Sequence, residues 1–227
     1  MTEPAQSPAV LTVDIVSDVM CPWCYIGKRR LEAALAELDG EIAVDVRWQP
    51  YQLDPTLPKA GKDRRTYLED KFGGPERAAQ AYQSVRDAGA TDKIAFAFEA
   101  IKVSSNTLDA HRLIRWAGAQ GPQIQDRMVE VLFRMYFEDG RNIGDDAVLL
   151  EAAVEAGLDR SVVEPLLRSD ADKAEVTAEI DLARRMGVTG VPCFIIDNTY
   201  AVMGAQPAAA LARTLREISA GRNTAAS

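Results

Sequence analysis

The pattern of apolar and polar positions divides the chain into an α/β beginning, a long helical middle and an α/β end. Near the start, residues 10–17 (VLTVDIVS) are rich in β-branched side chains and predict a strand. Residues 42–49 (IAVDVRWQ) alternate between apolar and polar and predict a second strand. Between them, leucines and alanines of residues 31–38 recur at helical spacing. Residues 1–9 hold prolines and small polar residues, and predict a loose tail.

The middle of the chain predicts a block of helices. Residues 51–61 contain two prolines and a glycine and are expected to form a linker. Asp63 is placed to cap the first helix, and Pro75 and Pro122 each open another, because proline is tolerated at the first helical position. The expected helices cover residues 63–72, 75–89, 107–119, 122–137, 145–156 and 160–167, while the alternating residues 94–103 stay unassigned.

The last part of the chain returns to an α/β pattern. A helix is expected from Asp170 to Met186, followed by the short strands CFII and TYAV. Asp197-Asn198 between these strands suits a tight hairpin turn, and Pro207 opens a final helix. The two ends therefore match as halves of one α/β unit, and the helical block is interpreted as an insertion. The predicted domains are residues 1–58 with 170–227, and the inserted all-helical domain 59–169.

The composition argues against nucleic acids and membranes as binding partners. The 227 residues include 34 acidic and 26 basic side chains, giving a net charge of −8, which argues against a general nucleic-acid binder. The basic runs Lys28-Arg29-Arg30 and Arg184-Arg185 lie inside helical patterns and are expected on solvated helix faces. No stretch approaches the roughly 20 apolar residues of a membrane span, so no membrane partner is expected.

The N-terminal segment and the cysteine count favour the cytoplasm. No basic residue precedes the first apolar run, and Asp14 and Asp18 interrupt it, so the segment does not resemble a secretion signal. Three cysteines are also too few for a disulfide-stapled secreted protein. In the cytoplasm a close pair of cysteines is more often catalytic or metal-binding than structural.

Such a pair lies in the segment VMCPWCYIGK, residues 19–28, where the first strand gives way to a helix. Cys21 is expected near the helix N-cap and Pro22 at the first helical position. Free N–H groups and the positive end of the helix dipole favour a thiolate there. Since the thiolate is the nucleophile of disulfide exchange, Cys21 would attack and Cys24, one turn on and partly covered, would resolve the mixed disulfide.

Two other interpretations of the pair stay open. Cys21, Cys24, Cys193 and His111 could form a zinc site, but they are scattered along the chain and Pro22-Trp23 starts a helix, so no metal is expected. The two cysteines could also be inert core residues, which would leave their strand-to-helix position unexplained. His111 is either a packing residue or part of a groove.

Three separated stretches resemble the DsbA family of thioredoxin-fold proteins, and within it the FrnE-like branch. They are CPWCYIGKRRLE after a strand, NTLDAHRL in the middle and GVTGVPCFIIDNTYAVMGAQ near the end. The resemblance extends from about residue 10 to residue 220. It implies a thioredoxin-like α/β fold with an inserted all-helical domain, in agreement with the element order, and thiol–disulfide oxidoreductase activity.

The resemblance also implies roles for individual residues. Cys21 would be the attacking thiol and Cys24 its partner, while Val191-Pro192 would match a cis-proline loop that lies against the pair. Pro22, Trp23, Val191 and Pro192 would then contact the substrate. Cys193 follows the proline where this branch usually has an aromatic or aliphatic residue. It is either a buried strand residue or a third thiol near the pair.

The function expected from these features is disulfide exchange with protein or small-molecule thiols and disulfides, without a cofactor beyond the Cys21–Cys24 pair. Glutathione is left open as a co-substrate, and so is a homodimer. The alternative enzyme class is the glutathione-dependent group of 2-hydroxychromene-2-carboxylate isomerases and kappa-type transferases, which typically keep a serine at the first cysteine position. A chaperone-like binding module is the third possibility, and it would work without either cysteine.

Overall fold

Four strands from the two ends of the chain form one mixed sheet. The computed structural model describes residues 10–225, so the predicted tail at residues 1–9 lies outside the described residues. The strands are β1 (Leu11–Ser17), β2 (Val44–Pro50), β5 (Cys193–Ile196) and β6 (Tyr200–Met203), in the order β2-β1-β5-β6. β1 runs parallel to β2 and antiparallel to β5, so the central strand joins the N-terminal half of the sheet to the C-terminal half.

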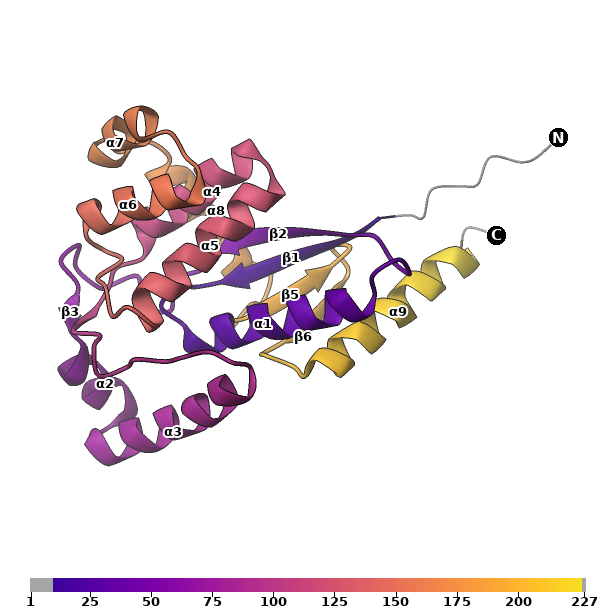
Figure 1. Cartoon of the computed structure of the whole chain (residues 1–227), viewed down its shortest axis with the longest axis horizontal. Coiled ribbons are helices and arrows are strands. Elements are labelled where there is room, and N and C mark those ends of the chain that lie inside the picture. The colour runs from indigo at the N-terminus through magenta and orange to yellow at the C-terminus, as the bar shows by residue number, and fades with distance from the viewer. Residues whose placement is uncertain (1–9, 226–227) are drawn as a thin grey trace.

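Helices cover both faces of this sheet. Helix α1 (Pro22–Glu37) packs against α9 (Ala208–Ala225), and their apolar residues share a core with Val13 and Ile15 of β1. Helix α8 (Lys173–Arg185) contributes to a smaller cluster on the reverse face. Because side chains of a strand alternate between faces, residues of β1 and β5 serve both clusters. Figure 1 shows this layering.

The remaining elements lie between β2 and α8 in the chain. They are β3 (Lys62–Asp63), α2 (Arg64–Phe72), α3 (Pro75–Thr91), β4 (Val103–Ser104), α4 (Leu108–Gln120), α5 (Pro122–Phe137), α6 (Asp146–Ala156) and α7 (Arg160–Arg168). Figure 1 shows α4 to α7 gathered at one end of the sheet, with α2 and α3 beside the N-terminal end of α1. The predicted α/β fold with a helical insertion is confirmed, while the exact domain boundaries remain a prediction.

One feature of the insertion was not predicted. β3 and β4 pair as a two-residue antiparallel ribbon, with Lys62 opposite Ser104 and Asp63 opposite Val103. Strands this short carry no periodic pattern, so only the approach of two distant segments creates them. The cap of α2, in contrast, follows the sequence: Asp63 caps this helix by accepting a hydrogen bond from the Thr66 N–H at 2.9 Å. The helix expected from Asp170 begins instead at Lys173.

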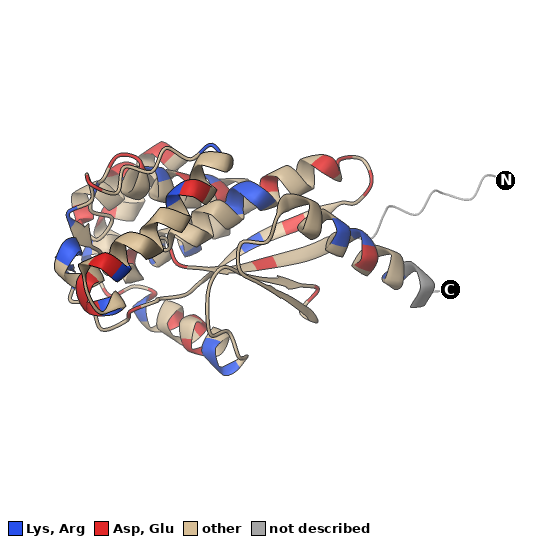
Figure 2. Ribbon diagram, turned by 90° about the horizontal axis from the view of Figure 1, so that it is seen from below, with Lys and Arg blue, Asp and Glu red and all other residues tan. Residues whose placement is uncertain are grey.

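Ion pairs join the cysteine-bearing helix to α5. Lys28 is only 3% exposed, and its Nζ lies 3.0 Å from Asp126 and 3.3 Å from Glu130 of α5, besides contacting Glu32. Figure 2 shows basic and acidic residues interspersed along the helices. The expected solvated face is therefore wrong for Lys28, because α5 covers its stem and supplies the carboxylates.

Among residues 10–225, none of the helices combines the length and hydropathy that crossing a membrane requires.

Candidate active site

The cysteine pair lies at the junction between the end of β1 and the start of α1, as predicted. Cys21 is the N-cap residue and Pro22 the first residue of the helix. The N–H of Cys21 donates to the carbonyl oxygen of Asp18 at 2.9 Å, and that of Cys24 donates to the carbonyl oxygen of Cys21 at 3.0 Å. The first turn of α1 itself has no acidic residue, and the buried carboxylate of Asp18 just before it accepts a hydrogen bond from the Met20 N–H. Both thiols are free.

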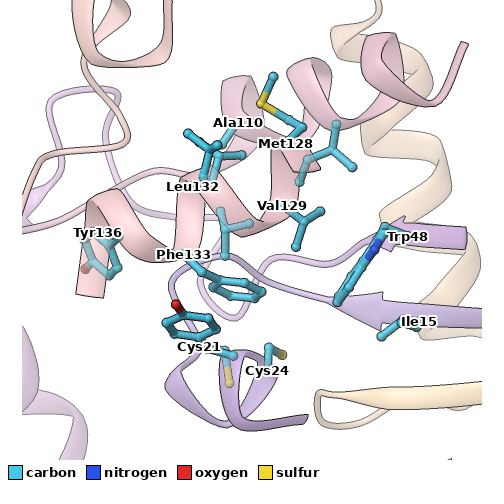
Figure 3. Packing of buried hydrophobic residues seen from close by; sticks show 14 of the residues in the cluster. Ile15, Cys21, Cys24, Trp48, Ala110, Met128, Val129, Leu132, Phe133 and Tyr136 are labelled. Atoms are coloured by element: carbon cyan, nitrogen blue, oxygen red, sulfur yellow. The ribbon is translucent and has the colours of Figure 1, made fainter. Parts of the chain in front are cut away.

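The two thiols are covered to different degrees. Cys21 is 5% exposed and Cys24 is 1% exposed. Cys21 nevertheless lines a surface hollow, and Trp23 beside it is 36% exposed. Figure 3 shows the helical turn with both cysteines beneath the Phe133 ring of α5. Only the first thiol therefore has a route to a substrate.

A loop before β5 closes over the first thiol. The Val191–Pro192 peptide bond is cis, which is the geometry that the resemblance implied. The Sγ of Cys21 lies 3.7 Å from the carbonyl oxygen of Val191, within range of a weak S–H···O hydrogen bond. The carbonyl oxygen of Pro192 accepts from the N–H of Gly204 at 2.8 Å, which anchors the loop to the end of β6. The structure thus brings together the two motifs that the sequence places 170 residues apart.

Gly27, which the sequence pattern did not single out, allows this close approach. A Cβ built on Gly27 would lie 2.8 Å from Cγ of Pro192 and 3.4 Å from the ring of Phe194. Any side chain there would push the loop away from α1 or force the proline ring to move. The only available signal was an isolated glycine inside a helical pattern, which often marks close packing.

A hollow of about 380 Å³ opens beside Cys21. Its walls come from the start of α1, from α2 and α3, and from the loop before β5. Of the predicted substrate-contacting residues, Pro22, Trp23 and Val191 line it, whereas Pro192, which packs against Gly27 of α1, does not. The other lining residues are Met20, Cys21, Leu53, Arg64, Tyr67, Leu68, Lys71, Phe72, Ala81, Tyr82, Ser84, Val85 and Gly190.

Burial raises the pKa of the second thiol. Complete burial raises the pKa of Cys24 well above that of an ordinary cysteine, and the adjacent Cys21 raises it further. The nearby Ser17 hydroxyl and the backbone of Asp18 oppose that rise. Cys24 is therefore a thiol, not a thiolate, near neutral pH, and it needs to lose a proton before it can attack.

We expect alkylation to reveal this difference. In a Cys193→Ala background, Cys24→Ser leaves Cys21 and Cys21→Ser leaves Cys24. At a pH below the pKa of a thiol, each unit by which that pKa is raised reduces the thiolate fraction about tenfold. Cys24 should therefore react with iodoacetamide only at higher pH than Cys21. The measurement is the alkylation rate against pH, with urea-unfolded variants as the control, where the two profiles should coincide. Coinciding profiles in the folded state would contradict the assigned polarity.

Cys193 belongs to the reverse face of the sheet. It is buried with Val16, Ala183 and Val188, whereas Cys21 and Cys24 belong to the main core on the other face. Burial raises the pKa of Cys193. These observations favour the buried strand residue over the third thiol.

His111 is buried but also lines a second hollow of about 420 Å³ formed by β2, α4, α5 and α8, away from Cys21, so the packing and groove interpretations both stay open. It is buried on α4, and its Nε2 lies 2.8 Å from the carbonyl oxygen of Tyr51. Within the part of the chain that the structure describes, no three His, Cys, Asp or Glu side chains are grouped so that they could hold a metal ion. The absence of zinc in the protein stays a prediction.

Comparison with known proteins agrees with this geometry. The sequence profile of the DSBA-like thioredoxin domain matches residues 12–216, which is nearly the whole described chain. The chain belongs to this family. Members of the DsbA-like family are disulfide oxidoreductases, and the matched range includes the cysteine pair and the cis-proline loop.

Solved structures show the same fold over almost the full length. The crystal structure of a probable DsbA oxidoreductase from Streptomyces coelicolor has 35% sequence identity and a TM-score of 0.82, over 93% of this chain and 90% of that one. The cytosolic disulfide reductase DsbM from Pseudomonas aeruginosa has 22% identity and a TM-score of 0.63, over 90% and 98% of the two chains. A 2-hydroxychromene-2-carboxylate isomerase has 17% identity and a TM-score of 0.69, over 95% and 99%. The last two likenesses show the fold alone.

Proposed function

We propose that this DsbA-like chain is a dithiol–disulfide oxidoreductase that exchanges disulfides with protein or small-molecule substrates through Cys21 and Cys24. The observation that carries the proposal is the position of Cys21. It caps α1, lies 3.7 Å from the carbonyl oxygen of Val191, and is the one of the two thiols that lines the hollow. A substrate sulfur in the hollow can meet Cys21 while Cys24 stays shielded behind it.

The exchange proceeds in two balanced steps. The Cys21 thiolate attacks one sulfur of a substrate disulfide, which forms a mixed disulfide and releases the first substrate thiolate. Cys24 then loses its proton and attacks the Cys21 sulfur, which forms the Cys21–Cys24 disulfide and releases the second thiolate. Two electrons pass from the protein dithiol to the substrate. The same steps in reverse oxidise a substrate dithiol, and the redox potential decides the direction.

The proposal includes a cellular setting and a substrate surface. We place the chain in the cytoplasm and in the FrnE-like branch, with Pro22, Trp23, Val191 and Pro192 as the surface that meets the substrate. Support for the cytoplasm comes from DsbM, which is a cytosolic disulfide reductase. DsbM has also been solved with glutathione, which supports glutathione as a candidate co-substrate here. No cofactor besides the cysteine pair is part of the proposal.

The rival function is a glutathione-dependent isomerase, which the likeness to the 2-hydroxychromene-2-carboxylate isomerase supports at the level of fold. Dithiol–disulfide exchange needs two thiols, and a glutathione-activating site needs one hydroxyl or thiol. Here a second thiol, Cys24, lies one turn behind the first and is buried next to it. A resolving thiol in that position favours disulfide exchange.

Equilibration with glutathione tests the proposal. Incubated in a series of reduced and oxidised glutathione ratios and then acid-quenched, the wild type should convert between a dithiol and a Cys21–Cys24 disulfide with a slope of two electrons. Cys24→Ser should form only a glutathione adduct on Cys21. Mass spectrometry after alkylation measures each species. A wild type that forms no intramolecular disulfide at any ratio would exclude dithiol–disulfide exchange and favour the isomerase.

A further inference from the structure

Arg64, the first residue of α2, is a buried cation without a carboxylate partner. Its side chain is 4% exposed, and none of the ion pairs found within residues 10–225 includes it. Nη1 donates to the hydroxyl of Tyr136 at 2.9 Å and Nη2 donates to the hydroxyl of Tyr82 at 2.8 Å. Its guanidinium also lies over the rings of Tyr82, Phe98 and Tyr136, at 5.3, 5.9 and 5.6 Å from their centroids.

The other deeply buried arginine shows what a purely structural guanidinium looks like here. Arg112 is fully buried and pairs with Asp109 at 2.8 Å. It also donates to backbone carbonyl oxygens near the end of α7, those of Leu166, Leu167, Ser169 and Ala171. Its charge is matched and its donors are used. Arg64 has five N–H donors, and its side-chain hydrogen bonds within the described residues go to two neutral hydroxyls.

Arg64 lines the hollow beside Cys21. Lys71, two turns further along α2, lines the same hollow, and neither Asp nor Glu is among the lining residues. The charged side chains that line the hollow are therefore all basic, in a chain whose net charge is −8. Burial is the largest cause of the raised pKa of Tyr82; the Arg64 guanidinium lowers this pKa, and the nearby Cys21 raises it. Tyr82 is thus within electrostatic reach of both the cation and the thiol.

Two carboxylates lie near the hollow without lining it: burial is the largest cause of the raised pKa of Tyr67, and Asp54 and Asp18 raise it further. Asp18 is fully buried, and its carboxylate accepts hydrogen bonds from the N–H groups of Met20 and Leu53. The Asp54 carboxylate accepts from Thr56. A guanidinium in a poorly hydrated site is costly unless an anion reaches it. The start of α1, whose first turn has no acidic residue, also lines this end of the hollow.

We propose that Arg64 and Lys71 bind a carboxylate of the substrate, so that the hollow selects disulfides and thiols that carry a carboxylate close to the sulfur. This inference rests on the proposed disulfide exchange and names its substrate class. Arg64 makes the charge-assisted hydrogen bonds, and Lys71, which is exposed at the rim, attracts the anion. The carboxylate belongs to a small molecule or to an acidic residue beside a cystine.

Three small disulfides of similar size test the charge preference. They are 3,3′-dithiodipropionate, bis(2-hydroxyethyl) disulfide and cystamine, which are anionic, neutral and cationic. The reduced, oxygen-free protein is mixed with each probe in a single turnover. Cys21 and Cys24 lose two electrons and form a disulfide, and the probe is reduced to two thiols. The readout is the second-order rate of protein disulfide formation.

The wild type should react about tenfold or more faster with the anionic probe than with cystamine, and added salt should reduce that ratio. Lys71→Gln should lower the ratio about threefold, and Arg64→Gln should bring it near one, because the charge-assisted bonds are lost. Arg64→Lys should retain part of the preference. Arg65→Gln is the matched control, since Arg65 is the next residue, is 84% exposed and does not line the hollow; its ratio should equal that of the wild type.

Two further arms complete the test. Cystine-bridged peptides with either glutamate or lysine beside each cysteine show whether the carboxylate comes from a peptide. A preference for the glutamate peptide over the lysine peptide, or for dithiodipropionate over cystamine, supports the inference if it depends on Arg64. Equal rates for all probes in the wild type, or a preference that survives in both Lys71→Gln and Arg64→Gln, would overturn it. If Arg64→Gln fails to fold, Lys71→Gln and the salt dependence decide. No reaction with any probe would instead refute the proposed exchange.

Discussion

Replacement of Cys24 by alanine is expected to leave substrates covalently attached to the protein through Cys21. The mixed disulfide is released when the second thiol attacks, and Cys24→Ala removes that thiol. Cys21→Ala should trap little, because Cys24 is fully buried and its pKa is raised by that burial. Insulin reduction should fall on the order of a thousandfold or more in both variants, since each lacks one step of the exchange. Non-reducing gels before and after dithiothreitol measure the adducts.

Cys193 provides an internal control for this experiment. It lies in the cluster on the reverse face of the sheet, so it should be unable to resolve an adduct on Cys21. Cys24→Ala and Cys24→Ala/Cys193→Ala should therefore trap equal amounts. Adducts that form through Cys24 in Cys21→Ala would reverse the two roles. Full activity in Cys21→Ala would remove the oxidoreductase proposal.

The largest effect on stability is expected at Phe133. Its ring is fully buried in α5, stacks on Tyr25 with centroids 4.9 Å apart, and meets Trp48 edge-on at 6.4 Å. Phe133→Ala should lower the free energy of unfolding by about 3–5 kcal/mol, because it removes the buried ring and leaves a cavity between α5 and α1. Urea unfolding followed by circular dichroism measures the change.

Two variants bracket that prediction. Phe133→Leu keeps most of the volume and should cost less than half as much as Phe133→Ala. Tyr200→Ala removes an aromatic ring that is 51% exposed and should change the free energy of unfolding by less than about 0.5 kcal/mol. A loss at Phe133 as small as that at Tyr200 would mean that α5 does not support α1 as the packing indicates.

The parts of the site that the sequence predicts are those set by local rules. A proline at the first helical position and a cysteine before it place the thiol pair at the start of α1, and the structure agrees. Asp197-Asn198 forms the expected tight turn, with both residues at positive φ. The cis-proline loop required the family resemblance, because nothing in the pattern of residues links it to the cysteines.

The features that escaped prediction depend on partners far away in the chain. Lys28 looks like a surface residue until α5 covers it with carboxylates. Gly27 gains its purpose only when Pro192 lies against α1. Arg64 sits in an ordinary polar stretch, RRTYLEDK, and only the packing of α2 against α3 and α5 buries it among tyrosines. Helical periodicity describes one element at a time and carries no information about such neighbours.

The separation of Cys21 from Val191 has a consequence during translation. The two residues are 170 positions apart, so the thiol emerges from the ribosome long before the loop that covers it. At synthesis rates of 5–20 residues per second, the interval is roughly 10–30 s. Throughout that time β1 lacks its β5 neighbour, and the thiol pair meets the redox buffer of the cell without its native surroundings. Nascent chains should therefore acquire glutathione adducts and non-native disulfides more readily than the finished protein does.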